Sequence, residues 1–190
     1  MKKTFSFLLV LVMLFPLLSA GAMAANTVLS AQKLTCEGKS IECEKYNIDG
    51  SNYFKLRDIA CLLNGTVSQF SVGWDSEAKV VSIVTGEAYE PNGGELDLSA
   101  GDQSATAVPS SQTVKINGIE RTDLAVYNIG GSNFFKLREL GGALGFFVDY
   151  DRETNTAVIK SLAEVENPDV WRMSGETVAA KGFVMEIANS

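Results

Sequence analysis

The chain has 190 residues, 46% of them apolar, which is enough for a packed core and for one or two small domains. It carries 16 basic and 23 acidic residues, a net charge of −7, and no histidine. The absence of histidine excludes histidine-ligated copper sites, Ser-His-Asp triads and Cys-His dyads. The acidic balance also argues against nucleic acid or an anionic membrane surface as a partner.

Residues 1–24 have the pattern of a secretory signal peptide. Lys2 and Lys3 precede an apolar run at residues 5–18, and Ala22-Met23-Ala24 resembles a cleavage site. The alternative is a membrane anchor, but the run is shorter than the ~20 residues that span a bilayer. We therefore expect cleavage after Ala24, a secreted or cell-surface location, and no membrane attachment of the mature chain. The mature chain would keep 14 basic and 23 acidic residues.

One phrase occurs twice in the chain. Residues 46–57 read YNIDGSNYFKLR and residues 127–138 read YNIGGSNFFKLR, with ten of twelve positions identical. This identity indicates an internal duplication. It divides the mature chain into a first copy at residues 33–85 and a second at residues 112–160.

In chain order, residues 25–32 are expected to form a short, loose start. Each copy then predicts strand, strand, helix, strand, strand, so the fold class is α+β with two tandem repeats. Asn117-Gly118 is a strong hairpin signal in the second copy. Apolar spacing predicts helices near residues 55–63 and 136–144, which end at Asn64-Gly65 and Gly145.

Two segments match neither copy. Residues 86–111 are rich in glycine, proline, serine and acid, which predicts a linker, although Tyr89 and the Leu96/Leu98 alternation indicate that part of it is held on a repeat. Residues 161–190 form a C-terminal extension, too apolar for a free tail, that adds a strand pair or binds a partner. The two copies either pack against each other or each pair with flanking segments.

All three cysteines lie in the first copy. A hairpin turn centred between residues 39 and 40 would place Cys36 opposite Cys43, close enough for a possible disulfide, and leave Cys61 unpaired on the helix. The alternative is that the cysteines are buried free thiols, because the positions aligned with Cys36 and Cys43 in the second copy are the apolar Ile116 and Leu124.

The repeated phrase, followed in each copy by a Trp-Asp or Tyr-Asp hairpin, resembles the copper amine oxidase-like N-terminal domain, also called the stalk domain. That family occurs in tandem on exported proteins of Gram-positive bacteria. The resemblance covers about residues 33–85 and 113–160. It implies α+β modules in the cell envelope. It does not imply copper or quinone chemistry, because the stalk is separate from the catalytic domain of the amine oxidases.

No residue pattern predicts catalysis, a cofactor or a metal site. The acids that the two copies share have structural explanations, Asp58 and Glu139 in a helix's first turn and Asp75 and Asp151 at the start of a hairpin turn. The alternating oxygen-bearing side chains of residues 149–155 resemble a calcium loop, but a hairpin turn is the favoured interpretation. We therefore expect no enzyme activity.

Two groups of side chains are candidates for ligand contacts. Lys55, Arg57, Lys136 and Arg138 would form a basic ridge that grips an anionic wall polymer; the favoured alternative is a pair of intramolecular ion pairs with packed stems. Four aromatic residues would stack on sugars or belong to the core, and their strand spacing favours the core. These aromatic residues are Tyr53, Phe134, Trp74 and Tyr150.

The sequence therefore predicts a non-catalytic, exported structural or stalk module of the cell envelope. The alternative is a binding module for cell-wall polysaccharide or peptide. The expected partners are a wall polymer or another envelope protein, and no oligomeric state is predicted. Exposure distinguishes the two functions, because solvent-facing aromatics in a groove favour ligand binding and buried aromatics favour a spacer.

Overall fold

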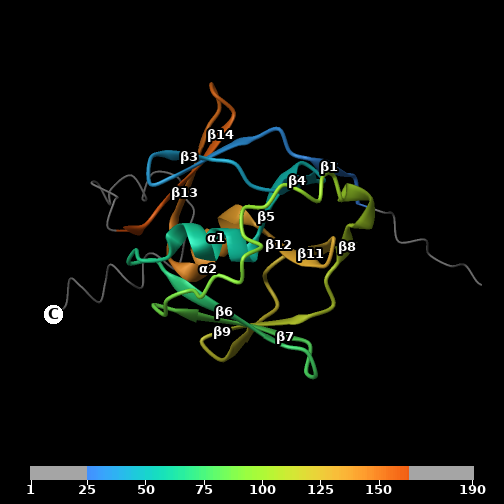
Figure 1. Ribbon diagram of the computed structural model, residues 1–190, viewed down its shortest axis with the longest axis vertical. Helices are drawn as coiled ribbons and strands as arrows, with labels where there is room; N and C mark the ends of the chain where they lie inside the picture. The colour runs from blue at the N-terminus through green and yellow to red at the C-terminus, as the bar shows by residue number, and fades with distance from the viewer. Residues whose placement is uncertain (1–24, 163–190) are drawn as a thin grey trace, which may run out of the picture.

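The computed structural model describes residues 25–162 as a mixed α+β fold, mostly sheet, with two short α-helices (Figure 1). The predicted signal peptide, residues 1–24, lies outside the described residues. So does nearly all of the predicted C-terminal extension, residues 163–190.

The central sheet has six antiparallel strands in the order β1-β4-β5-β12-β11-β8. Its two halves come from the two copies and meet at β5 and β12. Phe54 pairs there with Phe135, which occupies the same position of the duplicated phrase, and both are almost completely buried. The strands are β1 (Thr27–Leu29), β4 (Lys45–Ile48), β5 (Ser51–Lys55), β12 (Ser132–Lys136), β11 (Val126–Ile129) and β8 (Val108–Pro109).

Two four-stranded sheets complete the fold, in the orders β10-β9-β7-β6 and β13-β14-β2-β3. Each joins a hairpin of one copy to a hairpin of the other through a parallel pair, β7 with β9 and β14 with β2. Every sheet therefore contains strands of both copies, and the copies interlock. The strands are β2 (Lys33–Cys36), β3 (Lys39–Ile41), β6 (Phe70–Asp75), β7 (Val80–Thr85), β9 (Thr113–Ile116), β10 (Ile119–Arg121), β13 (Phe147–Asp151) and β14 (Thr156–Lys160).

The helices α1 (Leu56–Leu63) and α2 (Leu137–Leu144) lie where they were predicted. Both contact β5 and β12, and each also contacts the strand that follows it, β6 or β13. In Figure 1 they lie between the two four-stranded sheets. As predicted, α1 ends at Asn64, and α2 ends at Gly145, which has the left-handed conformation (φ 76°) common at helix ends.

The apolar core has two parts. The larger part joins both helices to the four-stranded sheets and includes Phe54 and Phe135. The smaller part is centred on Tyr46, Tyr53 and Phe134 of the central sheet. Tyr46 and Phe134 meet edge to face there, with ring centroids 5.2 Å apart, a favourable arrangement for aromatic rings.

The predicted order of two strands before each helix is incomplete. The phrase that was expected to run from a turn into a helix instead forms the hairpins β4–β5 and β11–β12. Their two-residue turns, Asp49-Gly50 and Gly130-Gly131, place both residues at positive φ, as the tightest hairpins require. The second predicted strand of each copy is also divided in two, so within its copy each helix follows four strands, β2 to β5 or β9 to β12.

The start of the described chain is also better ordered than predicted. Residues 27–29 form the edge strand β1, and Gln32 is buried. The backbone N–H of Ser30 donates to the carbonyl of Lys45 at 2.9 Å. The predicted loose start at residues 25–32 is therefore wrong, because backbone pairing with β4 fixes it.

The predicted pairing of Cys36 with Cys43 is wrong in register. Strands β2 and β3 turn at Glu37-Gly38, so Cys36 lies opposite Lys39, and Cys43 lies beyond the end of β3. All three cysteines are free thiols, with Cys36 and Cys43 buried and Cys61 half-buried. Burial raises the pKa of Cys36 to about 11 and of Cys43 to about 12, so both thiols stay protonated near neutral pH.

Candidate functional site

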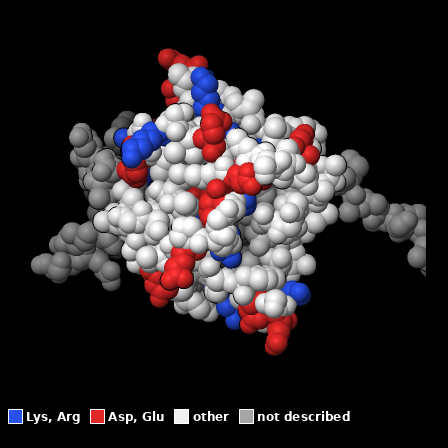
Figure 2. Space-filling model, viewed as in Figure 1, with Lys and Arg blue, Asp and Glu red and all other residues white. Residues whose placement is uncertain are grey.

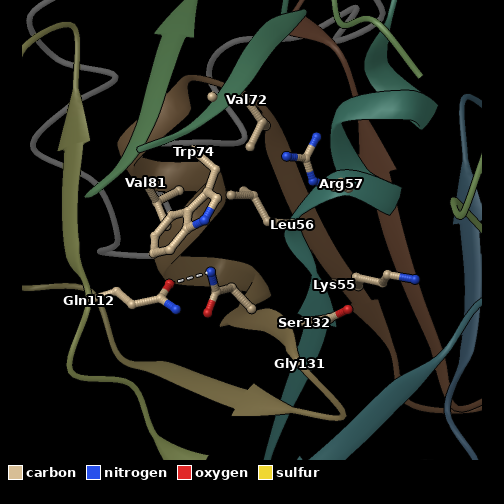
Figure 3. Close-up of a pocket in the computed structure, with 11 residues that line it drawn as sticks. Lys55, Leu56, Arg57, Val72, Trp74, Val81, Gln112, Gly131 and Ser132 are labelled. Carbon is tan, nitrogen blue, oxygen red and sulfur yellow. Dashed lines mark hydrogen bonds between the residues drawn. The ribbon is translucent and has the colours of Figure 1, made fainter. Parts of the chain in front are cut away.

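A pocket of about 260 Å³ opens where the central sheet meets the β10-β9-β7-β6 sheet (Figure 3). We call it the Trp74 pocket. Its lining comes from the junction of β5 and α1, from β6 and β7, from the start of β12, and from Gln112. Both copies therefore contribute to it, because β12 and Gln112 belong to the second copy.

Trp74 is the exposed aromatic of this pocket. Phe70, Val72 and Trp74 share one face of β6. Phe70 is completely buried, whereas Trp74, near the outer end of the strand, is 42% exposed. Trp74 pairs with Val81 across the hairpin. The ammonium nitrogen of Lys79 lies 5.9 Å from the indole centroid, within the range of a cation–π contact.

Two side-chain amides line the pocket on the side of the second copy. Asn133 Nδ2 donates to Gln112 Oε1 at 2.6 Å, as Figure 3 shows by a dashed line. This bond fixes the Gln112 amide, whose Nε2 has no partner among residues 25–162. Sequence reasoning missed both residues. Ser110-Ser111-Gln112 ends directly before β9, as the similar Ser30-Ala31-Gln32 ends directly before β2, and this similarity was the signal that could have found Gln112.

The four predicted basic contacts separate into two pairs. Lys55 and Arg57 line the Trp74 pocket. Lys136 and Arg138 lie at the start of α2 and do not contribute to this lining. Lys136 pairs with Glu139 at 3.0 Å.

The Lys55 and Arg57 side chains are held by residues 86–98, which we call the strap. Lys55 Nζ donates to the carbonyl of Gly94 at 2.9 Å and lies 3.9 Å from the Asp58 carboxylate. Arg57 Nη1 donates to the Tyr89 hydroxyl at 3.2 Å, with its guanidinium carbon 6.0 Å from the ring centroid. Lys55 therefore has an acidic partner, as the favoured alternative for the basic ridge expected, whereas the partner of Arg57 is a tyrosine and not an acid.

The strap is fixed on α1 by buried and hydrogen-bonded groups. Asn64 Nδ2 donates to the carbonyl of Tyr89, and Asn64 Oδ1 accepts the backbone N–H of Tyr89, each at 2.9 Å. The Tyr89 side chain is buried. Burial acts to raise the pKa of Glu95, but hydrogen bonds from Tyr89, Asn92 and Gly93 outweigh it and lower this pKa to about 2. The expectation that Tyr89 is held on a repeat is therefore confirmed.

Asp58 lies beneath the strap and is completely buried. Its Oδ1 accepts the backbone N–H of Leu96 at 3.0 Å, and its Oδ2 has no partner within the described part of the chain. Burial raises the pKa of Asp58 to about 6, although the Leu96 bond and Lys55 act in the opposite direction. A carboxyl covered in this way cannot touch a substrate, so its role here is structural.

The four aromatic residues predicted as ligand contacts divide into two buried and two exposed residues. Tyr53 and Phe134 belong to the core, whereas Trp74 and Tyr150 are exposed. The Tyr150 hydroxyl donates to Asn155 Oδ1 at 2.9 Å, which ties the ring to its own hairpin turn.

The acidic turn at residues 149–155 is a hairpin turn, as the favoured interpretation expected. Asp151 Oδ1 accepts the backbone N–H groups of Glu153 and Thr154. Among residues 25–162, no group of three or more His, Cys, Asp or Glu side chains is placed to hold a metal ion. No helix in this range has the length and apolar character to cross a membrane.

A scan against protein-family models, a search of curated proteins and a search of solved structures each found no match for the chain.

Proposed function

We propose that the protein is an exported, non-catalytic structural module of the cell envelope, built from two stalk-like repeats with a strand-strand-helix-strand-strand core. The observation that carries this proposal is the interlocking of the copies, in which every sheet contains strands of both. Neither copy can leave the assembly without breaking all three sheets. Such a unit resists being pulled apart, which suits a spacer that holds other parts of an envelope at a distance.

The positions of the first and last described residues, Ala25 and Leu162, support a spacer. In Figure 1 the described chain starts beside β1 at the right and ends after β14 at the left. A load applied between these ends is carried by strands of both copies. The partners in this proposal are a wall polymer or another envelope protein.

The distribution of surface charge and the burial of Asp58 also favour a structural role. Acidic and basic side chains form small separate patches on the face in Figure 2. A strong single-sign field, which would steer a highly charged macromolecule to this face, is therefore not expected there. The acid with the raised pKa, Asp58, is covered by the strap rather than open to a ligand.

Fractionation of the producing cells tests the proposal. The full chain is expected in the envelope or the medium, with a mature N-terminus at Ala25 by mass spectrometry. A chain that lacks residues 2–24 is expected to remain inside the cell. Full-length protein that stays in the cytosol with Met1 intact would contradict export, and peroxide release from simple amines would contradict the non-catalytic role.

A second candidate function is binding of cell-wall polysaccharide or peptide. The exposed Trp74 in a pocket with fixed amides favours it. Retention of the mature protein on purified peptidoglycan or wall polysaccharide, compared with bare resin, tests this candidate.

A further inference from the structure

The Trp74 pocket offers a flat apolar surface to solvent. Trp74 is 42% exposed, and Leu56, Val72 and Val81 surround it in the lining. Figure 3 shows the indole between Val81 and Leu56, with the Gln112 amide near its lower edge. An exposed indole gains free energy when it packs against the C–H face of another ring.

The polar groups at the rim are already in place. Gln112 is fixed by the 2.6 Å bond from Asn133, and its Nε2 donors have no partner among the described residues. The Ser132 hydroxyl lies in the same lining. Amides and hydroxyls donate to and accept from sugar hydroxyls, and fixing them beforehand lowers the entropy cost of binding.

Arg57 adds a positive charge to this lining. The hydrogen bond to the Tyr89 hydroxyl uses one guanidinium nitrogen, and the Tyr89 ring lies beside the group. The other guanidinium nitrogens have no acceptor within residues 25–162. A guanidinium that is held in place and retains free donors favours a carboxylate, to which it can donate two parallel bonds.

The equivalent hairpin of the second copy lacks this combination. Tyr150 replaces Trp74, and its hydroxyl is occupied by Asn155. Asp149 replaces Gly73, which adds a carboxylate to this hairpin next to Tyr150, on the opposite face of the strand. The difference limits the site to the first hairpin and supplies a matched control.

We propose that the Trp74 pocket binds a saccharide ring that carries a carboxylate, with the ring against the Trp74 indole and the carboxylate at the Arg57 guanidinium. Hydroxyls of the ring meet Gln112 and Ser132. This proposal rests on the second candidate function and names its ligand class. A saccharide fits better than a peptide because the recognising groups are one flat aromatic face and side-chain donors for hydroxyls.

The test uses the mature chain, residues 25–190, with Trp171→Phe so that Trp74 is the only indole. Trigalacturonic acid, its methyl ester and a trialanine peptide with a free carboxylate are titrated by calorimetry and by indole fluorescence. We expect the acid to bind at least tenfold more tightly than the ester. Trp74→Ala is expected to weaken binding at least tenfold, and Arg57→Gln to remove the preference for the acid, whereas Tyr150→Ala stays within twofold of the parent.

Thermal melting of each variant checks that it is folded. If Trp74→Ala does not fold, Trp74→Leu, which removes the indole but keeps an apolar side chain, provides the binding measurement instead. Equal binding of acid and ester, unchanged binding by the folded Trp74 variant, tighter binding of the peptide, or no saccharide binding would each overturn the proposal. Retention of Trp74→Ala on wall polysaccharide as strong as that of the parent would overturn this site and leave the second candidate function standing. Envelope location is measured separately and does not depend on either result.

Discussion

The first turns of α1 and α2 have nearly the same sequence and different surroundings. In α1, Asp58 is completely buried beneath the strap, and burial raises its pKa to about 6. In α2, the aligned Glu139 is about one-third exposed, pairs with Lys136 at 3.0 Å and accepts the backbone N–H of Ala125. The same helical position thus holds a costly buried acid in one copy and an ordinary ion pair in the other.

The difference comes from chain outside the duplicated phrase. The phrase forms the same hairpin and the same helix start in both copies. Only α1 lies beneath the strap, which desolvates Asp58 and engages Lys55 and Arg57. Duplication therefore repeats the backbone, while the segments between and around the copies determine the chemistry of equivalent side chains.

The largest expected loss of stability is at the junction of β5 and β12, where the two copies contribute equivalent residues. Phe54 and Phe135 pair with each other and are each at most 1% exposed. Phe54→Ala and Phe135→Ala should each lower the free energy of unfolding by about 3–5 kcal/mol, because each leaves a cavity at the same junction. Denaturant unfolding measures both. A difference of more than about 2 kcal/mol between them would break the equivalence of the copies.

Asp58→Asn should change how the free energy of unfolding depends on pH, whereas the equivalent change in the second copy should not. Below the ordinary carboxyl pKa of 3.8 the Asp58 carboxyl is protonated in both the folded and the unfolded chain, so no free energy is lost to burying a charge. Between pH 3.8 and about 6 the unfolded chain releases the proton and the folded chain keeps it, so wild-type stability falls as pH rises. Above about pH 6 the group is ionised in both states, and the loss in the free energy of unfolding stays constant at up to about 3 kcal/mol.

Asparagine keeps the acceptor for Leu96 and removes the charge, so Asp58→Asn should be more stable than wild type at pH 7, by about 2 kcal/mol. This gain should shrink towards pH 4. Unfolding curves at several pH values check it. The control Glu139→Gln should change stability by less than about 1 kcal/mol at pH 7, because its ion pair is partly exposed. A loss of stability in Asp58→Asn at pH 7 would contradict this account.

A smaller effect tests how each helix packs on the strand that follows it. Gly141 takes the place of Ala60, and a Cβ there would lie 2.7 Å from Val148 Cγ2 and 3.0 Å from the Phe146 carbonyl. Gly141→Ala should therefore destabilise the protein by about 1 kcal/mol, since overpacking exceeds the gain in helix propensity. The control Gly142→Ala, aligned with Cys61, should be neutral or stabilising. Thermal melting compares the two, and a stabilising Gly141→Ala would contradict the close approach.

Sequence patterns predicted what depends on local periodicity. The apolar spacing located both helices, and Asn117-Gly118 located the hairpin of β9 and β10. Strands β5 and β12 were missed because Ser51-Asn52 and Ser132-Asn133 were assigned to turns that lead directly into the helices. The β-forming Tyr53 and Phe54 after an Asp-Gly turn were an available signal for a second strand.

The cross-copy pairing could not be predicted from local patterns. Parallel pairs such as β14 with β2 join residues more than 120 positions apart, and their choice depends on packing of the whole molecule. The register of β2 and β3 depended on a two-residue turn at Glu37-Gly38, and misplacing that turn displaced the predicted partner of Cys36. The Trp74 pocket combines residues of both copies, so it could be assembled only once this pairing was known.

Engineered disulfides test the interlocking most directly, in a chain with Cys36, Cys43 and Cys61 changed to alanine. Thr35 lies opposite Val158, and Ser82 lies opposite Lys115. Thr35→Cys/Val158→Cys and Ser82→Cys/Lys115→Cys should each oxidise to an intramolecular disulfide, found by peptide mapping. Thr35→Cys/Ser82→Cys, which would meet if each copy folded by itself, should stay reduced. An intramolecular disulfide in this last pair, with free thiols in the other two, would contradict the interlocked fold.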